Sequence, residues 1–466
     1  MHRKSIILLF FLLTITSGLL LWQWRSYSES TKENHEKKFE QVRQHIKIET
    51  AERELKITQT ITGLMKDKEY QLVRPDKLFR WQCGCTSYNP DSNTILTAKG
   101  EVRFTFVIPI PDESAFLLTD WTANIQDVKI METAIDIAEK GKRGSTWIAG
   151  IPQTGYEQLS FIDFYSFKGK GGTPSLYWQQ DPLEKKSLNK SLFIFTDPTL
   201  AKNADFKSLT GIKPNEYIAV IFTDAVIPMM GQGIKVVSLG SRFEIIEREI
   251  IYSYYKEKLK QLDNQEYWIV DFLTALTAGT TPMVKKSEIM LAELSQHLTE
   301  DERRLFVQVV QQKKKLIDFQ MLDQILGDIK GLKTSFFSIN KDEKSEFISL
   351  LFMDARKFII NGNKTNIKIV YSNDKVLFPF IETLKAMGFE VETDGSTFYA
   401  KNKNEQYTFF LDQPIFQRNG TDFGLLENPL YVDNNQVYIK NKLLQSIFQV
   451  TIKENQQAIM LDDVSL

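Results

Sequence analysis

The most distinctive residues for chemistry are two cysteines two positions apart, in Cys83-Gly84-Cys85. Two thiols at this spacing could chelate a soft metal, form a disulfide or exchange disulfides with another protein. A zinc site would need two further ligands, and no other Cys or His lies nearby in the sequence. Gly84 permits the tight turn that such a short bridge requires. We predict a structural disulfide between Cys83 and Cys85, with a redox or metal role as the alternative.

Two aspartates, Asp197 and Asp224, each follow a Phe-Thr pair at the end of an apolar run. If the two runs were parallel neighbouring strands, both carboxylates would lie at one sheet edge, where ligands often bind. Such a pair could hold a cation or act in acid–base catalysis. Aspartate also commonly opens the turn after a strand, and Pro198 favours that interpretation. The two residues are therefore acidic candidates only, and no residue is assigned as catalytic, cofactor-binding or metal-ligating.

Motifs of the common catalytic and nucleotide-binding sites do not occur in the chain. It has no G-x-S-x-G, H-E-x-x-H or G-x-x-x-x-G-K-S/T sequence, and the glycine-rich stretch 168–172 is typical of a hairpin loop. Aromatic side chains could stack on sugars, but most aromatics of a β-rich region belong to its core. The aromatic residues considered for a sugar-binding face are Trp147, Tyr156, Tyr165, Tyr177 and Trp178.

The composition is that of a folded globular protein. The chain has 466 residues, enough for two or three domains of about 150 residues each. Hydrophobic residues make up 42% and charged residues 25%, which excludes a wholly disordered chain, a collagen-like repeat and a multi-spanning membrane protein. The net charge of -1 predicts no general attraction to nucleic acid.

The amino end carries an apolar run without a charged residue, from Ser5 to Trp22. As a helix its 18 residues would be about 27 Å long, close to the roughly 30 Å of a bilayer's hydrocarbon core. Arg3 and Lys4 precede the run and predict a cytoplasmic amino terminus, with the rest of the chain outside the cell. We predict a cytoplasmic stub and an uncleaved signal anchor in residues 1–25. A cleaved signal peptide is the alternative.

Three regions follow this anchor. Residues 26–69 are dense in charge and free of proline, and we predict a charged helical spacer there. Residues 70–240 have the pattern of a β-rich domain, since apolar and polar residues alternate from Val102 to Ile108. Residues 241–360 have helical spacing, and Thr299 with Glu302 predicts a capping box at the start of an amphipathic helix.

The C-terminal region contains an internal repeat, because residues 376–400 align with residues 437–461 without a gap at a spacing of 61. The matched apolar pairs are Val376 with Val437, Phe378 with Ile439, Met387 with Phe448, Val391 with Ile452, and Phe398 with Ile459. The turn-forming pairs Asn373-Asp374 and Asn434-Asn435 precede the two copies. Each copy predicts a strand, a helix turn and a hairpin, which is a structural signal without chemistry.

The repeat resembles the copper amine oxidase N-terminal-like domain, or stalk domain, of exported proteins of Gram-positive bacteria. That family has a variable-valine-proline stretch, a helix ending in leucine-glycine, and a valine before a polar hairpin. The first copy keeps Pro379, Gly388 and Val391, whereas Lys440 and Gln449 replace the proline and the glycine in the second. The match of this degenerate copy rests on Tyr438, Ile439, Leu444, Phe448 and Ile452.

The resemblance implies a non-catalytic appendage and not an amine oxidase. The catalytic domain of those oxidases needs three histidine copper ligands and a tyrosine in an Asn-Tyr-Asp or Asn-Tyr-Glu motif. This chain has no such tyrosine motif. The four histidines of the chain, which include no His-x-His pair, are His2, His35, His45 and His297. Amine oxidase activity is therefore not expected, and no cofactor is predicted.

These features together predict an α+β multidomain protein. Its parts would be an N-terminal transmembrane helix, the spacer, the β-rich domain, the helical segment and, in residues 361–466, a pair of small α+β repeats. We expect a membrane-anchored, extracytoplasmic cell-envelope protein with a non-catalytic binding or scaffolding role. Its expected partners are the membrane, through the N-terminal helix, and the cell wall or another envelope protein. The alternatives are a cell-wall-modifying hydrolase with its site in the β-rich domain and a thiol-based envelope sensor.

Overall fold

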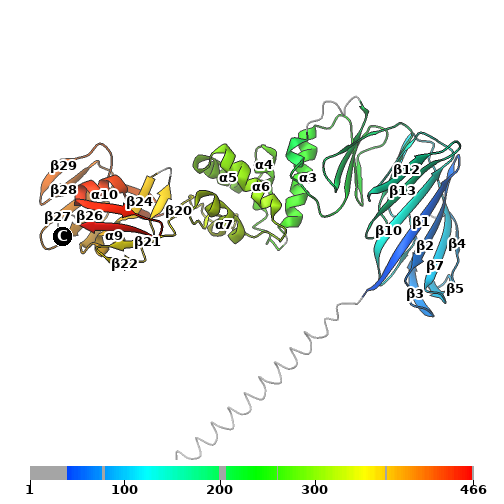
Figure 1. Cartoon of the computed structure of the whole chain (residues 1–466), viewed down its shortest axis with the longest axis horizontal. Coiled ribbons are helices and arrows are strands. Elements are labelled where there is room, and N and C mark those ends of the chain that lie inside the picture. Colours follow the sequence, from blue (N-terminus) through cyan, green and yellow to red (C-terminus); the bar gives the residue numbers. More distant parts are fainter. Residues whose placement is uncertain (1–38, 76–78, 199–205, 260, 373–374, 464–466) are drawn as a thin grey trace, which may run out of the picture. The chain divides into compact units, whose positions relative to one another are not determined.

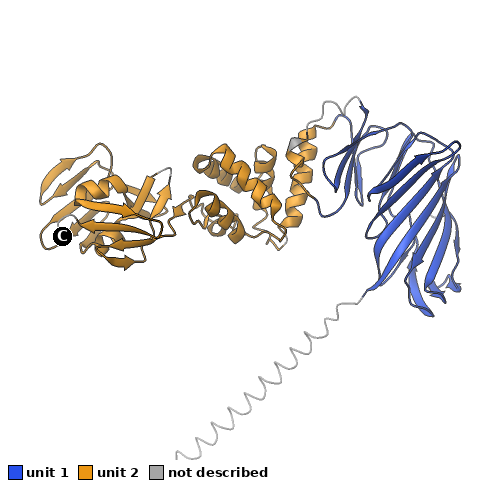
Figure 2. Ribbon diagram, in the orientation of Figure 1, with its two compact units in different colours: residues 1–203, 214–240 blue, residues 204–213, 241–466 orange. Residues whose placement is uncertain are grey.

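The computed structural model describes residues 39–75, 79–198, 206–259, 261–372 and 375–463. The chain separates into two compact units, residues 1–203 with 214–240 and residues 204–213 with 241–466 (Figure 2). The first unit is built from strands, and the second contains helices followed by a strand-rich region. The predicted domain boundaries stay predictions, because this division distinguishes only two units.

The predicted fold class, an α+β multidomain protein that begins with a transmembrane helix, is wrong. The structure is strand-rich, with 41% strand and 21% helix. Among the described residues no helix is both long and apolar enough to cross a membrane. The predicted anchor in residues 1–25 lies outside the part of the chain that the structure describes.

The predicted helical spacer over residues 26–69 is also wrong where the structure describes it. Two long antiparallel strands, β1 (Glu40–Thr50) and β2 (Glu54–Thr62), occupy most of this region. The buried residues of β1 are Val42, Gln44, Ile46, Ile48 and Thr50. Burial of every second residue is the period of a strand, and the polar residues between them face solvent. The apolar residues of this region also fit an imperfect helical stripe. The pairing of the two segments in a sheet therefore decides between helix and strand.

The first unit is organised around a seven-stranded sheet (Figure 1). In spatial order its strands are β12 (Gln153–Gln158), β13 (Asp163–Lys170), β10 (Val128–Glu139), β1, β2, β7 (Glu101–Pro109) and β4 (Phe79–Cys83). Along β7 the residues alternate between buried and more exposed positions, as their sequence pattern predicts. One face of the sheet thus contributes to a large apolar core, whereas the other face presents polar side chains to solvent.

Smaller sheets complete this unit. One consists of β5 (Ser87–Asn89), β6 (Thr94–Thr97), β3 (Lys68–Val73) and β9 (Asn124–Ile125), and a second of β11 (Thr146–Ala149), β14 (Leu176–Gln179) and β8 (Ala115–Leu118). The third consists of β15 (Glu184–Ser187), β16 (Leu192–Thr196), β17 (Ile218–Phe222), β19 (Ile234–Val237) and β18 (Met229–Gly231). Within it β16, β17 and β19 run parallel, so these three strands end at the same sheet edge.

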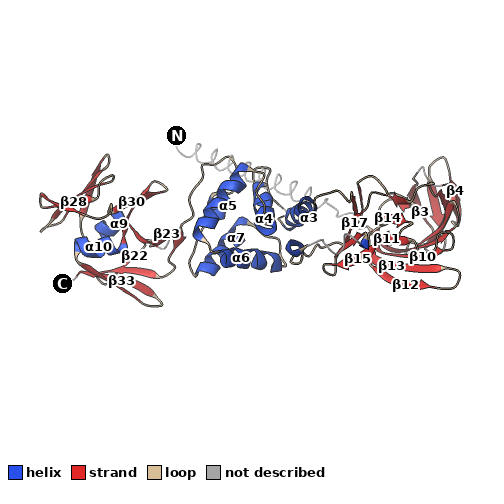
Figure 3. Cartoon of the chain, turned by 90° about the horizontal axis from the view of Figure 1, so that it is seen from above, coloured by secondary structure: helices blue, strands red, loops and turns tan. Residues whose placement is uncertain are grey.

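The second unit begins with helices (Figure 3). They are α3 (Phe243–Lys258), α4 (Trp268–Ala278), α5 (Lys285–His297), α6 (Glu300–Gln312), α7 (Phe319–Lys330) and α8 (Phe336–Ile339). The apolar helix α4 packs against α3, α5 and α6. At the start of α6 the predicted capping box is confirmed, because the Glu302 amide donates to Thr299 Oγ1 and the Thr299 amide donates to the Glu302 carboxylate.

The C-terminal part of this unit contains three sheets. The central one consists of β20 (Phe352–Met353), β23 (Val370–Ser372), β24 (Lys375–Pro379), β31 (Gln436–Lys440) and β30 (Leu430–Asp433). The second consists of β22 (Asn363–Thr365), β21 (Lys357–Ile360), β33 (Ala458–Asp463) and β32 (Val450–Glu454). The third consists of β25 (Glu390–Asp394), β26 (Thr397–Lys401), β27 (Gln406–Phe410), β28 (Ile415–Arg418) and β29 (Thr421–Gly424). Two short helices, α9 (Phe380–Ala386) and α10 (Asn441–Phe448), contribute to one core.

The two repeat copies have the same structure and meet each other. Each copy is a strand, a helix and a hairpin: β24, α9, β25 and β26 in the first, and β31, α10, β32 and β33 in the second. β24 and β31 are antiparallel neighbours, with Phe378 opposite Ile439, the residues that the alignment matches. Gln449 adopts a positive φ of 51° where Gly388 has 95°, so the second copy keeps the backbone bend without the glycine. The pair Asn373-Asp374 lies outside the described residues.

Candidate functional site

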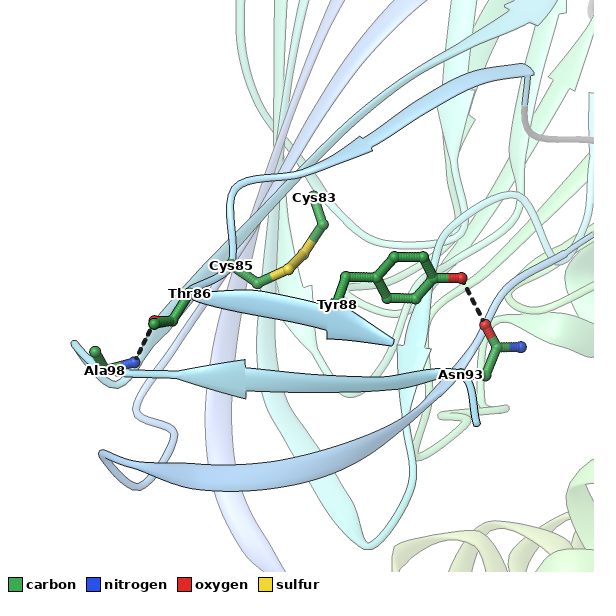
Figure 4. The surroundings of a disulfide bond; sticks show 6 residues. All are labelled: Cys83, Cys85, Thr86, Tyr88, Asn93 and Ala98. Atoms are coloured by element: carbon green, nitrogen blue, oxygen red, sulfur yellow. Dashed lines mark hydrogen bonds between the residues drawn. A yellow bond between two sulfur atoms is a disulfide. The ribbon is translucent and has the colours of Figure 1, made fainter. Parts of the chain in front are cut away.

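The structure joins Cys83 and Cys85 in a disulfide at the end of β4 (Figure 4). The Gly84 amide between them donates to Arg103 O at 2.7 Å, and the Thr86 amide donates to Leu96 O at 2.9 Å. Both cysteines are half-buried against the apolar core of the first unit. The bridge therefore closes the tight turn through which the chain leaves the seven-stranded sheet and enters β5.

We expect a modest stabilisation from this bridge. The double substitution Cys83→Ser and Cys85→Ser should lower the free energy of unfolding of the first unit by about 1.5 kcal/mol, because the bridge closes a loop of only three residues. Urea denaturation followed by tryptophan fluorescence measures the change, and the parent chain in dithiothreitol should show the same loss. Equal stability of all three samples would contradict a structural role and favour the redox alternative.

The predicted acidic candidates do lie at one edge of a parallel sheet, since β16 and β17 are neighbours. Their register is offset, because Phe195 lies opposite Ile221 and Asp197 therefore follows in line with Thr223. Asp224 is exposed and accepts hydrogen bonds from the Ser238 hydroxyl and from the Leu239 amide, the latter at 3.0 Å. These bonds are those of a turn-capping aspartate. A catalytic or cation-binding role for the two residues stays a prediction.

A third set of titratable groups, which the sequence did not indicate, lies on the exposed face of the seven-stranded sheet. His45 Nε2 lies 2.7 Å from one Asp136 oxygen, and Ser166 Oγ donates to the other at 2.7 Å. In a catalytic triad the histidine lies between the serine and the aspartate and removes the hydroxyl proton. Here the aspartate lies in the middle, so His45 cannot activate Ser166.

A groove of about 1100 Å³ lies in the second unit, and we call it the α5–α6 groove. The groove is lined by one face of α5, one face of α6, and the end of α4 with the loop that follows it. Residues at the 3₁₀-helix η1 (Lys207–Leu209) complete the lining. Its lining residues are Ser208, Thr210, Gly211, Ala275–Pro282, Glu288, Leu291, Ala292, Ser295, Glu300, Arg303, Arg304, Val307, Gln308 and Gln311. Small, hydroxyl and amide side chains dominate this list.

A buried ion pair holds the loop that forms the rim of the groove. The Arg248 guanidinium binds the Asp271 carboxylate, and the two side chains are only 12% and 5% exposed. The second oxygen of Asp271 accepts from the amides of Met283 and Val284, both at 2.9 Å. Arg248 also donates to Thr280 Oγ1 at 2.6 Å and to Thr281 O at 3.0 Å. Four hydrogen bonds from Arg248 and Asp271 therefore hold the loop after α4 in place.

Neutral hydrogen bonds and small side chains fix the walls of the groove. The Tyr255 hydroxyl lies 2.8 Å from Thr277 Oγ1, and burial raises the pKa of Tyr255 to about 12, so that this phenol stays neutral. Gly211 approaches Gln311 closely: a Cβ atom at Gly211 would lie 2.1 Å from Gln311 Oε1. The Ser208 hydroxyl is buried without a hydrogen-bond partner among the described residues. The walls are thus ordered, and one polar atom beside the groove is unsatisfied.

The charged residues of the groove differ in how they are paired. Arg304 pairs with Glu300 and Asp301, and Glu288 pairs with Lys285 at 2.9 Å. For Arg303 the described residues provide no ion-pair or hydrogen-bond partner for its side chain. Within the described part of the chain, the half-buried Arg303 thus has no opposite charge that compensates it.

Sequence reasoning did not identify this groove, although a signal exists. On α5 the lining residues Glu288, Leu291, Ala292 and Ser295 recur at intervals of three and four, which places them on one helix face. Such a face carries small and polar residues whether it borders bulk solvent or a groove. Only the packing of α4, α5 and α6 distinguishes the two.

The aromatic residues considered for sugar binding do not form an exposed face. Tyr156 is 52% exposed, whereas the other four are buried in the core of the first unit. Those buried residues are Trp147, Tyr165, Tyr177 and Trp178. The core interpretation is confirmed for these four residues and not for Tyr156.

Comparison with known families supports the assignment of the C-terminal region. Residues 359–461 match the family model of the copper amine oxidase N-terminal domain, which confirms the resemblance seen in the repeat. A stalk-like C-terminal domain is therefore present. The match covers less than half of the chain and does not include the α5–α6 groove. No curated protein matches the chain.

Among solved structures the chain is similar to M1 zinc metallopeptidases from Deinococcus radiodurans. One variant is 9% identical, with 63% of this chain and 91% of that chain covered at a TM-score of 0.34. A variant bound to a Tyr-Ser-Ala substrate is 8% identical, with 66% and 94% covered at a TM-score of 0.36. Another structure of the metallopeptidase is 9% identical, with 63% and 90% covered at a TM-score of 0.33. At these TM-scores the similarity supports no inference about activity.

Proposed function

We propose that this chain, whose C-terminal region matches the copper amine oxidase N-terminal domain, is an extracytoplasmic cell-envelope protein. Its role would be non-catalytic binding or scaffolding. Its binding surface is the α5–α6 groove. The observation that carries this proposal is the buried Arg248–Asp271 pair, which holds the groove rim in place before any ligand is present. A preorganised concave surface binds with a smaller loss of conformational entropy.

The lining of the groove favours binding over reaction. Its hydroxyl and amide groups can exchange hydrogen bonds with a ligand. The carboxylates Glu288 and Glu300 lie in ion pairs, which leaves them poorly placed to act as acid–base groups. The hydrolase and the thiol-sensor alternatives gain no comparable support, because Asp224 is engaged by its own turn and the cysteine bridge is half-buried.

Two features support a location outside the cytoplasm. The apolar run from Ser5 to Trp22 has the composition of an export signal. The Cys83–Cys85 disulfide is a bond that persists in oxidising compartments. We infer that the folded part of the chain acts on the outer side of the cell membrane, with the cell wall or another envelope protein as its partner. Cell fractionation tests this location: recovery of the chain from the cytoplasmic fraction would contradict it.

The test of the proposed role is cosedimentation of the full chain, in mild detergent, with isolated cell envelopes. Ala292 is exposed on the groove face of α5, so Ala292→Trp fills the groove without disturbing the core. We expect this variant to bind about tenfold more weakly, the effect of losing about 1.4 kcal/mol of binding free energy.

The matched control is Ala386→Trp, which places the same side chain on an exposed helical position of the stalk-like domain. It should sediment like the parent chain. Equal sedimentation of Ala292→Trp and the parent would show that the groove is not the binding surface. Failure of the parent to sediment would contradict an envelope partner altogether.

A further inference from the structure

We propose that the α5–α6 groove binds an extended peptide segment of a partner protein, and that an acidic side chain of this segment pairs with Arg303. The inference rests on the proposed function and specifies the class of partner. The juxtaposition that carries it is an arginine on α6, without a side-chain partner among the described residues, beside hydroxyl and carbonyl groups of α4, α5 and the loop after α4 and amide groups of α6 itself.

The charges of the groove select an anion. Its charged lining residues are Glu288, Glu300, Arg303 and Arg304. All but Arg303 have an opposite charge beside them within the second unit. Both carboxylates have a cation beside them, whereas Arg303 has no carboxylate beside it among the described residues and can pair with one from a ligand. The guanidinium presents parallel N–H donors that match the two oxygens of a carboxylate, so Asp or Glu side chains suit it best.

The length of the groove suits a short extended segment. Its lining follows α6 from Glu300 to Gln311, a rise of about 16 Å along the helix. An extended chain advances about 3.3 Å per residue, so about five residues fit this length. The cavity volume of about 1100 Å³ slightly exceeds the range of about 300–1,000 Å³ that is typical of sites for small molecules.

The polar groups of the groove match a peptide backbone, which needs acceptors for its N–H groups and donors for its carbonyls. The last turn of α4, Ala275–Ala278, lies in the lining. The Ala275 carbonyl accepts from the amides of Gly279 and Thr280, whereas the carbonyls of the three residues after it have no backbone donor among the described residues. Gln308, on the exposed side of α6, supplies an amide donor. None of the described lining residues is aromatic, so the stacking that sugar binding normally uses is not available here.

The apolar lining residues of the groove limit the side chains that can enter it. Small residues such as Ala278 and Ala292 lie in the lining together with Leu291 and Val307. The groove thus combines small and apolar side chains with its polar groups. A segment with alanine or serine between its acidic residues fits these dimensions, because alternate side chains of an extended chain point to opposite sides.

The inference is tested with three fluorescein-labelled peptides and the full chain in mild detergent. The acidic peptide is Ser-Ala-Glu-Ala-Asp-Ala-Ser, the neutral one has Gln and Asn in place of Glu and Asp, and the basic one has Lys at both positions. Fluorescence polarisation gives the dissociation constants. We expect the acidic peptide to bind about tenfold more tightly than the neutral one and the basic one to bind weakest, with a preference that declines as salt screens the ion pair.

Substitutions separate this inference from the proposed function. Arg303→Gln should abolish the preference for the acidic peptide, whereas Arg304→Gln, whose guanidinium pairs with Glu300 and Asp301, should retain it. Arg303→Gln should also melt within about 2 °C of the parent, since it removes no ion pair of the folded chain. Ala292→Trp should block every peptide.

The outcomes that overturn the inference are distinct. Equal affinity for acidic and neutral peptides, or an acidic preference that survives in Arg303→Gln, shows that Arg303 does not recognise a carboxylate. If Ala292→Trp then still blocks binding, the groove remains the binding surface and only the peptide class is wrong. If peptides bind Ala292→Trp as they bind the parent, both the inference and the proposed function fail. Absence of binding by every peptide overturns the inference and leaves the envelope experiment as the test of the proposed function.

Discussion

Asp271→Ala is expected to lower the free energy of unfolding of the second unit by about 3–5 kcal/mol, the usual effect of breaking a buried ion pair from one side. The substitution leaves Arg248, only 12% exposed, without its carboxylate. It also removes the acceptor of two backbone amides, those of Met283 and Val284. An unsatisfied buried group retains its full desolvation cost, so the several losses add to a large effect.

Urea denaturation followed by circular dichroism in the helical region measures this change, because the longer helices belong to the second unit. Asp318→Ala is the matched control: Asp318 is exposed and caps α7 through the Met321 amide at 2.8 Å. Loss of such a cap typically costs about 1 kcal/mol. An Asp271→Ala variant no less stable than Asp318→Ala would contradict the role of the ion pair. A destabilised groove rim should in addition weaken envelope binding.

Asp354→Asn is expected to lower the stability of the stalk-like domain by about 2–4 kcal/mol at neutral pH, because it neutralises the buried centre of a partly exposed network. Asp354 is bonded by the Arg356 guanidinium at 2.7 and 3.0 Å and by the Tyr371 hydroxyl at 2.9 Å. Arg356 continues to Glu454 at 3.0 Å and to Asn455 O at 3.1 Å. The network thus ties the entry of the domain to the hairpin of the second repeat copy.

This effect should depend on pH with a definite sign. Burial by itself raises the pKa of Asp354, but the hydrogen bonds from Arg356 and Tyr371 outweigh it and hold the pKa below its ordinary 3.8. A carboxylate with a lowered pKa contributes stability that is present above the ordinary value and is lost as the pH falls through the value in the folded chain. The difference between parent and Asp354→Asn should therefore be constant near neutrality and shrink below about pH 4.

Thermal unfolding from neutral to acidic pH measures this dependence. Asp394→Asn, at the exposed end of the hairpin strand β25, is the matched control and should leave the melting temperature nearly unchanged. A difference between parent and Asp354→Asn that grows on acidification would contradict the assigned direction.

Several local features could be predicted from the sequence. The capping box of Thr299 and Glu302 depends on residues three positions apart, and the strand β7 depends on an alternation within one segment. The Cys83–Cys85 bridge joins residues two positions apart, so a local turn is enough to bring the two thiols together. The interactions in each case lie within a few residues and are visible in the order of the chain.

The candidate site could not be predicted in this way. Arg248 and Asp271 are 23 residues apart and lie on different helices, and the groove needs η1 and α6, about a hundred residues apart. The prediction of a helical spacer was wrong for the same reason. Val42 and Ile46 fit either period, and β1 is a strand because β10, far along the chain, pairs with it.

By itself the sequence determined the repeat and its family, because apolar positions at a constant spacing of 61 residues preserve a buried face whatever the rest of the chain does. Phe378 and Ile439, matched by alignment, indeed lie opposite each other. Only the tertiary structure decided the strand-rich class, the parallel pairing of β16 and β17 and the α5–α6 groove. The physical reason is that the periodicity of apolar residues indicates which residues are buried. Packing between distant segments determines which residues they contact.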